Sequence, residues 1–168
     1  MGLTSLNLAD VGLSAQGDTR KFWTILEDRL EMCKESLMLR YDKLKDVTSD
    51  VSPIHWQHGA IARLKPGEKI NSLLKNGYST ISLGYIGLYE VTLLMTGQSQ
   101  TTPEGEKFAR KVMKRLRMAC EQWKAESGLG FGLYGTPAES LCYRFARIDK
   151  QRFGDIKDIT DKGYYTNS

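Results

Sequence analysis

The sequence lacks the features on which several classes of protein depend. No apolar run approaches the roughly 20 residues that cross a bilayer, and residues 1–13 contain no basic stretch of the kind that opens a secretory signal. Its three cysteines are widely spaced and form no Cys-x-x-Cys pair, which favours reduced thiols over a disulfide framework. We therefore expect one globular unit in the cytoplasm, without a membrane partner.

Histidine and hydrolase motifs are also scarce. The two histidines, His55 and His58, have no cysteine nearby and no clear carboxylate partner, so we do not expect a zinc site. No G-x-S-x-G segment supports a hydrolytic triad. The formal net charge of +4 is mild, and the basic residues of 107–117 share their segment with a clean apolar stripe. This pattern indicates a solvated helix face and not a nucleic-acid site.

The apolar pattern alternates short β-like runs with amphipathic helices. Apolar residues at three- and four-residue steps predict two long helices, over 19–45 after Asp18 and over 103–127 after Thr102. Such an alternation favours parallel strands with helices outside, an α/β layer or barrel segment. The predicted strands are 3–8, 78–88 and 130–135, the shorter helices are 69–77, 88–97 and 136–149, and the tail is loop or strand.

A literal G-x-G-x-x-G occurs within "GFGLYGTPAES", formed by Gly130, Gly132 and Gly135. A dinucleotide-binding fingerprint needs a strand before the first glycine and a helix opening at the last. Here a helix precedes the motif and the glycines fall inside the predicted strand. We therefore interpret them as bends or close backbone approaches.

The residues after the glycines predict a helix start. Thr136, Pro137 and Glu139 match a capping box, with threonine as N-cap, proline in the first turn and glutamate three residues on. The same turn could instead present free N–H groups to an anion, with Ser140 beside it and Glu139 facing a hydroxyl. The sequence leaves both interpretations open.

The cysteines favour packing over chemistry. Cys33 lies along the apolar stripe of its helix and Cys120 beside that of its own helix, as small core residues do. Cys142 could approach the end of the strand, but burial is the favoured interpretation. Nothing in the sequence indicates a lowered thiol pKa.

Four blocks resemble the anaerobic (class III, glycyl-radical) ribonucleoside-triphosphate reductases, in the same order and over essentially the whole chain: "TSLNL", "NGYSTISLGYIGLYE", "GFGLYGTPAESLCYRFARID" and "TDKGYYTNS". The resemblance implies an α/β fold, the later portion of a ten-stranded α/β barrel of the glycyl-radical enzyme and ribonucleotide reductase type. It also implies reduction of ribonucleotides to deoxyribonucleotides for DNA synthesis by radical chemistry.

The family's cofactors are implied to lie outside this chain. The resemblance implies a glycyl radical made by an iron–sulfur, S-adenosylmethionine-dependent activase, a thiyl cysteine, and structural zinc. The family's radical cysteine precedes the segment matching "TSLNL", so none of the three cysteines inherits its role. The glycyl-radical and zinc motifs follow "YYTNS", and the allosteric module lies far upstream. Residues 1–168 are thus expected to be a single barrel segment with no cofactor or metal of its own, inactive alone.

The resemblance assigns the substrate phosphates to the turn between the glycine strand and its helix, formed by Gly135, Thr136, Pro137, Ala138 and Ser140. Glu139 is the candidate catalytic residue, contacting substrate or assisting proton movement, with helix capping as the rival role. Ser82 would line the barrel interior, and Tyr164, Tyr165 and Asn167 would border the active site.

The implied partners are a ribonucleoside triphosphate, the remaining parts of the reductase and its activase, with self-association into a homo-oligomer. Two alternatives stay open: a non-catalytic piece that completes a partner's barrel, and an independent module that binds nucleotide phosphates. The sequence does not identify the nucleotide, or whether formate or a thiol protein is the reductant.

Overall fold

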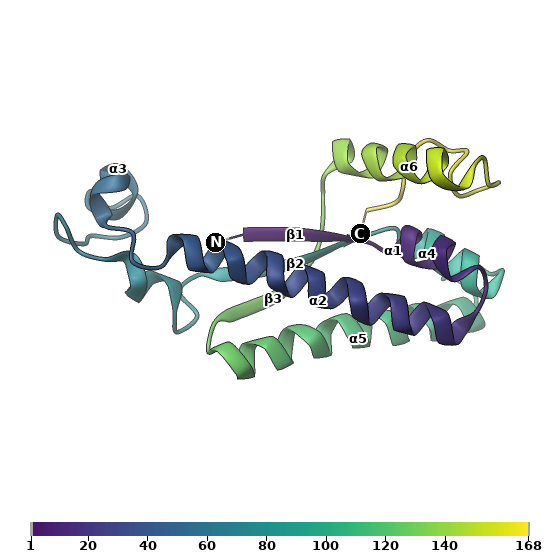
Figure 1. Ribbon diagram of the computed structural model, residues 1–168, viewed down its shortest axis with the longest axis horizontal. Helices are drawn as coiled ribbons and strands as arrows, with labels where there is room; N and C mark the ends of the chain where they lie inside the picture. Colours follow the sequence, from purple (N-terminus) through teal and green to yellow (C-terminus); the bar gives the residue numbers. More distant parts are fainter. Residues whose placement is uncertain (1, 168) are drawn as a thin grey trace.

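The computed structural model describes residues 2–167, which form a parallel three-stranded sheet packed against long helices (Figure 1). The strands are β1 (Gly2–Asn7), β2 (Thr80–Ile86) and β3 (Gly130–Gly135), in the spatial order β1-β2-β3. The predicted strands and their parallel pairing are confirmed. In the part of the chain that the structure describes, β1 and β3 each pair along one edge only.

Two long helices cover one face of the sheet. Helix α2 (Thr19–Leu44) begins where the Asp18 carboxylate accepts a hydrogen bond from the Lys21 amide at 2.9 Å. Helix α5 (Pro103–Ser127) begins where the Thr102 hydroxyl accepts from the Gly105 amide at 3.3 Å. Both predicted caps are confirmed, and each satisfies an amide that the helix itself leaves unpaired.

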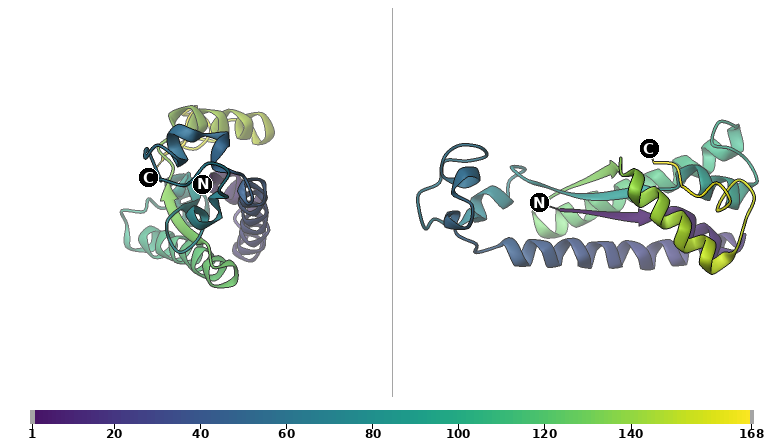
Figure 2. Two further views of the ribbon diagram at one scale, coloured as in Figure 1. Left: turned by 90° about the vertical axis from the view of Figure 1, so that its left-hand side faces the viewer. Right: turned by 90° about the horizontal axis from the view of Figure 1, so that it is seen from above.

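Three further helices begin at the carboxyl edge of the sheet, where the parallel strands end. Helix α1 (Leu8–Ala15) follows β1 directly, α4 (Leu88–Thr96) follows β2, and α6 (Glu139–Phe153) follows β3. Helix α6 lies on the other side of the strands from α2 and α5 (Figures 1 and 2). Helices α4 and α6 were predicted, whereas α1 was not.

The segment between α2 and β2 extends beyond the amino end of the strands (Figure 1). It contains η1 (Ser49–Val51), the short helix α3 (Pro53–Trp56) and η2 (Ile70–Leu74), which is a 3-10 helix where the sequence predicted a helix over 69–77. A small separate core of Ile70, Leu73 and Leu74 holds this segment together.

The main apolar core lies between the sheet and the α2–α5 layer. Phe22 and Leu30 of α2, Leu83 of β2 and Leu116 of α5 are all buried there. A second core lies at the carboxyl edge, where α1, α6 and the chain after residue 155 meet. Cys33 and Cys120 belong to the first core and Cys142 to the second, which confirms their predicted burial.

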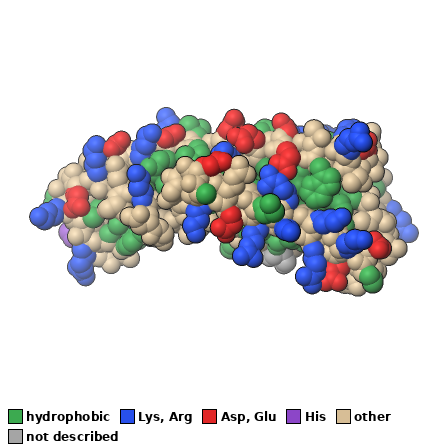
Figure 3. Space-filling model, turned by 90° about the horizontal axis from the view of Figure 1, so that it is seen from below, with side chains coloured by type: hydrophobic (Ala, Val, Ile, Leu, Met, Phe, Trp, Pro, Cys, Tyr) green, Lys and Arg blue, Asp and Glu red, His purple; other side chains and the backbone are tan. Residues whose placement is uncertain are grey.

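Charged side chains of both signs lie over the outside of the molecule. Figure 3 shows Lys and Arg interspersed with Asp and Glu on the face seen from below. On α5 the basic side chains Lys107, Arg110, Lys111, Lys114 and Arg117 are exposed, as a solvated helix face requires. Among the helices described within residues 2–167, none combines the length and apolar character needed to span a membrane.

Candidate functional site

The turn from β3 to α6 differs from the predicted capping box. Thr136 is 2 % exposed, its amide donates to the Tyr85 carbonyl oxygen at 3.3 Å, and its hydroxyl lies 2.8 Å from that of Ser5. These contacts hold Thr136 against the end of β2 and against β1, away from the helix. The N-cap is Ala138, so Glu139 is the first helical residue, and the prediction of Thr136 as cap and Glu139 as its capping-box partner was wrong.

The corrected boundary changes which backbone groups are free. An alanine N-cap has no side chain to accept hydrogen bonds from the first turn, and no side-chain cap is present on α6. Within residues 2–167 the amides of Glu139 and Ser140 donate no hydrogen bond. Both side chains are exposed. The positive end of α6 is therefore open to an external acceptor.

A cavity of about 390 Å³ lies beside this helix start. Its walls come from α6 and from the end of the described chain: Glu139, Cys142, Tyr164, Tyr165, Thr166 and Asn167. The structure thus brings the predicted Glu139 together with the predicted tyrosines and Asn167. Gly135, Pro137, Ala138 and Ser140 lie within four residues of Glu139 in the sequence, but they are not among the residues that line the cavity.

Ser82 is not part of this cavity. It lies in the middle of β2, paired with Leu3 on one side and Gly132 on the other. Because strand side chains alternate, Ser82 faces away from the core that buries its neighbours Ile81 and Leu83. The predicted role of Ser82 in lining a barrel interior stays a prediction.

Tyr165 lines the cavity and is also held in the fold by two hydrogen bonds. Its side chain is buried, its amide donates to the Cys142 carbonyl oxygen at 3.2 Å, and its hydroxyl donates to Asp149 Oδ2 at 2.9 Å. Burial, followed by the negative charge of Asp149, raises the pKa of the Tyr165 phenol above its ordinary value. Tyr165 thus stays a neutral hydrogen-bond donor at any ordinary pH.

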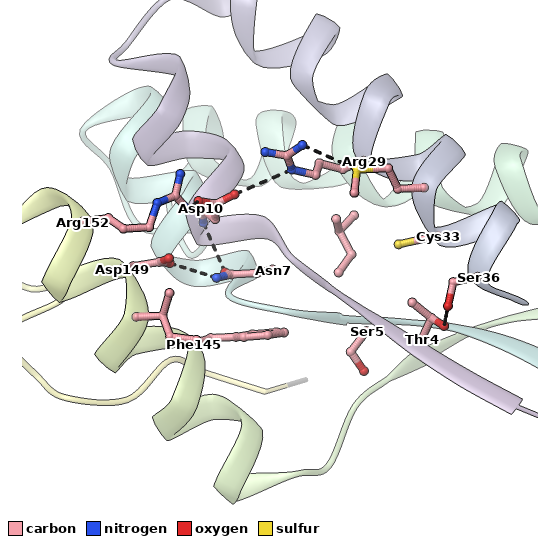
Figure 4. Close-up of a pocket in the computed structure, with 13 residues that line it drawn as sticks. Thr4, Ser5, Asn7, Asp10, Arg29, Cys33, Ser36, Phe145, Asp149 and Arg152 are labelled. Atoms are coloured by element: carbon pink, nitrogen blue, oxygen red, sulfur yellow. Dashed lines mark hydrogen bonds and ion pairs between the residues drawn. The ribbon is translucent and has the colours of Figure 1, made fainter.

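A polar cluster that the sequence did not reveal lies behind Tyr165. Asn7 Nδ2 donates to Asp149 Oδ2 at 2.9 Å, and Asp10 pairs with Arg152 (Figure 4). The cluster borders a second cavity of about 410 Å³ between β1, α2 and α6. Burial raises the pKa of the Asp149 carboxyl, although the hydrogen bonds from Asn7 and Tyr165 oppose the shift. The sequence signal was weak, since Asn7 and Asp149 lie 142 residues apart.

The remaining titratable groups offer no metal site and no activated thiol. Burial raises the pKa of Cys33 and of Cys120 to about 11. Burial and the nearby Glu139 carboxylate raise that of Cys142, which borders the cavity. Over the described range 2–167, no three His, Cys, Asp or Glu side chains gather closely enough to bind a metal ion.

The comparison with known proteins decides the family. A sequence model of the family described as anaerobic ribonucleoside-triphosphate reductase matches residues 1–168. The chain belongs to that family. Curated reductases of this name are 43 % identical in Salmonella typhimurium, 42 % in Escherichia coli and 40 % in enterobacteria phage T4, each over the whole of this chain. The chain spans about a quarter of their length: 24 %, 24 % and 27 %.

The same α/β fold is found in solved structures of this family. The anaerobic ribonucleotide reductase of Thermotoga maritima with citrate in its active site matches 98 % of this chain and 29 % of its own, with a TM-score of 0.71 and 21 % identity. Its complex with dATP and CTP matches 97 % of this chain and 26 % of its own, with a TM-score of 0.69. The predicted family and fold class are confirmed.

Proposed function

We propose that this chain is a segment of an anaerobic ribonucleoside-triphosphate reductase and that it binds the substrate's phosphate groups at the start of α6. The observation that carries this proposal is the pair of unpaired amides, Glu139 and Ser140, beside a cavity of about 390 Å³. Free amides and the helix dipole together favour an anion at a helix N-terminus. The Thermotoga maritima enzyme has been solved with citrate, MES or glycerol in its active site.

The residues of the turn have distinct proposed roles. The path of the backbone into α6 is fixed by Gly135, Thr136, Pro137 and Ala138. Ser140 offers the phosphate two hydrogen-bond donors, its backbone amide and its hydroxyl. Thr136 acts through the backbone, because its side chain is committed to Ser5.

The side chains around the turn have roles further from the phosphates. Glu139 is proposed to accept a hydrogen bond or a proton from the sugar, since its carboxylate would repel phosphate. Tyr165 and Asn167 border the nucleotide, and Ser82 lines the open face of the sheet.

The radical chemistry of the family is proposed to reside in other parts of the reductase. In the complete enzyme, a glycyl radical made by an iron–sulfur, S-adenosylmethionine-dependent activase would supply the unpaired electron that starts the radical chemistry. This chain's part is to bind and orient the ribonucleotide. Its three cysteines are buried in packed cores, and no three His, Cys, Asp or Glu side chains of residues 2–167 lie close enough to hold zinc, so we assign them no radical or metal-binding role.

A second candidate function is that of an assembly piece, favoured by the unpaired edges of β1 and β3 within residues 2–167. Unpaired strand edges invite pairing with another chain. In this case the partners would be the remaining reductase or a second copy. Size-exclusion chromatography tests it: a monomer that stays monomeric at high concentration contradicts self-assembly through these edges.

Calorimetric titration of the 168-residue chain with CTP and with inorganic triphosphate tests the phosphate site. We expect binding at millimolar ligand, weakened about tenfold or more by Ser140→Asp, which places a negative charge where the phosphate would bind. An acid at this position favours the helix dipole, so stability should not fall. Gln151→Glu, the same charge change near the other end of α6, is the matched control.

Two results would contradict the proposal. The first is absence of heat with the unaltered chain, and the second is equal affinity of Ser140→Asp and the unaltered chain. Nucleotide reduction by the 168-residue chain with activase would contradict the assignment of the radical steps to other parts of the enzyme.

A further inference from the structure

Glu90 is fully buried, and within residues 2–167 the hydrogen bonds to its carboxylate come from Lys162 and Thr166. Thr166 lies in the segment Tyr164–Asn167 that forms one wall of the 390 Å³ cavity, and Lys162 lies just before this segment. Lys162 Nζ donates to Glu90 Oε1 at 2.8 Å. The Thr166 amide donates to Oε1 at 3.1 Å, and the Thr166 hydroxyl donates to Oε2 at 2.7 Å. A buried charge persists only where partners of this kind replace its water.

Thr166 also accepts a hydrogen bond from the start of α4. The Gly87 amide donates to the Thr166 carbonyl oxygen at 2.8 Å. Gly87 has a φ of 87°, a left-handed conformation that a residue with a side chain rarely adopts, and it is the N-cap of α4. The start of α4 therefore binds both backbone groups of Thr166: Gly87, the N-cap, binds its carbonyl oxygen, and Glu90, in the first turn, binds its amide.

Lys162 extends the influence of Glu90 to a second cavity residue. Its ammonium nitrogen lies 4.8 Å from the centre of the Tyr89 ring and 5.8 Å from that of Tyr164. Both distances are within the range of cation–π attraction. Because Glu90 fixes the ammonium group, it also fixes the charge against which the Tyr164 ring packs.

We propose that Glu90 is a positioning residue, which sets the wall formed by Tyr164–Asn167 opposite the first turn of α6 and thereby the width of the phosphate-bearing ligand's site. This inference rests on the proposed function, because it concerns the same cavity. Glu90 does not line the cavity and acts through Thr166 and Lys162. A carboxylate whose only role was to interact favourably with the positive end of the α4 dipole would not need three hydrogen-bond donors from Lys162 and Thr166.

The test compares CTP affinity of the 168-residue chain with and without the charge of Glu90. Glu90→Gln preserves the size of the side chain but removes its charge. It also leaves a single oxygen to accept the hydrogen bonds that the two carboxylate oxygens now accept from Lys162 and Thr166. We expect the dissociation constant to rise about tenfold, the effect of losing one charge-assisted hydrogen bond. Val112→Ala, in the core between the sheet and α5, lowers stability away from the cavity and should leave affinity unchanged.

A double-variant cycle separates positioning from a general loss of stability. If Glu90 acts through Lys162, Glu90→Gln combined with Lys162→Met should weaken CTP binding by less than the product of the two separate fold-changes. Should Glu90→Gln fail to fold, Thr166→Val, which deletes one of the same hydrogen bonds from the other side, serves in its place with the same expected direction.

The outcomes distinguish the two proposals. If the unaltered chain binds CTP and Glu90→Gln, or Thr166→Val in its place, binds equally well, the positioning role is overturned and the proposed function stands. An equal loss of affinity in Val112→Ala also overturns the positioning role, because the effect would then follow stability. If the unaltered chain does not bind CTP, the proposed function fails and this inference fails with it.

Discussion

The hydroxyl oxygens of Ser5 and Thr136 lie 2.8 Å apart, although 131 residues separate them in the sequence. Gly84 lies between their strands, and a Cβ atom there would come within 2.2 Å of Thr136 Oγ1 and 2.7 Å of Ser5 Oγ. Because Gly84 of the central strand has no side chain, there is room beside it for the hydrogen bond between Ser5 and Thr136. This contact holds the Thr136 side chain against β1, and α6 begins at Glu139.

The Ser5–Thr136 hydrogen bond is expected to stabilise the fold. Thr136→Val should lower the free energy of unfolding by about 1–3 kcal/mol, because it removes the bond and leaves the Ser5 hydroxyl without its partner. Ser5→Ala should have an effect of the same sign. Urea denaturation of the two variants and of their combination should give a double variant less destabilised than the sum. Strict additivity would show that the hydroxyls do not interact.

Gly84→Ala should destabilise the chain by about 1–3 kcal/mol or more, because the new methyl group overlaps both hydroxyl oxygens. Gly132→Ala on the neighbouring strand is the matched control. Its Cβ would meet Thr80 Cγ2 at 3.2 Å, a contact with one side-chain methyl. Thermal denaturation should give Gly84→Ala a clearly lower midpoint temperature than Gly132→Ala, and the reverse order would contradict the geometry.

Asp149 should make stability depend on pH. Its pKa in the folded chain is raised above the ordinary 3.8, so the fold favours the protonated carboxyl. As pH rises, Asp149 therefore loses its proton in the unfolded chain at a lower pH than in the folded chain. The stability that the protonated carboxyl contributes is lost as pH rises from 3.8 through the raised pKa. Asp149→Asn does not titrate. Its stability relative to the unaltered chain should therefore increase with pH across this window.

Chemical denaturation at a series of pH values measures this difference. Asp155→Asn is a suitable control, since Asp155 is an exposed carboxyl paired with Lys150 at the end of α6. A stability difference between Asp149→Asn and the unaltered chain that is constant, or that decreases with pH, would contradict the direction of the pKa shift.

The three thiols should resist alkylation in the folded chain. All are buried, and burial raises the pKa of Cys33 and Cys120 to about 11, so little thiolate is present near neutral pH. Mass spectrometry after iodoacetamide treatment should show slow labelling of all three, with Cys142 first because it borders a cavity. Labelling in urea should be rapid. Rapid native labelling of Cys33 would contradict its place in the core.

The elements that the sequence predicted are those with a one-sided apolar pattern or a local cap. Phe22 and Leu30 recur on one face of α2, and Thr102 caps α5 with the next residue a proline, so both helices were evident. Helix α1 was missed because it is short and buried on nearly every side, so that its residues are as typical of a buried strand as of a helix. Its signal was Asn7, whose side chain accepts from the Asp10 amide at 3.2 Å.

The parts of the site that were missed depend on contacts between distant residues. The local pattern of Thr136 and Glu139 predicted a capping box, but Ser5 competes for the threonine hydroxyl from another strand. Likewise, the role of Glu90 follows from Lys162 and Thr166, more than 70 residues later. Periodicity and spacing describe one segment at a time, so neither relationship was accessible before the strands were placed.

The common starting edge of α1, α4 and α6 has an electrostatic consequence. Each helix N-terminus is equivalent to about half a positive elementary charge, carried by peptide groups. Peptide groups do not titrate, and replacing a side chain does not remove them. This partial positive charge at one edge is therefore built into the connectivity of the parallel sheet and is present wherever the chain folds. Each helix also carries a carboxylate in its first turn, and those of α1 and α4 are paired, Asp10 with Arg152 and Glu90 with Lys162. The net charge of the edge therefore depends on these side chains and their partners, whereas the contribution of the peptide groups is fixed.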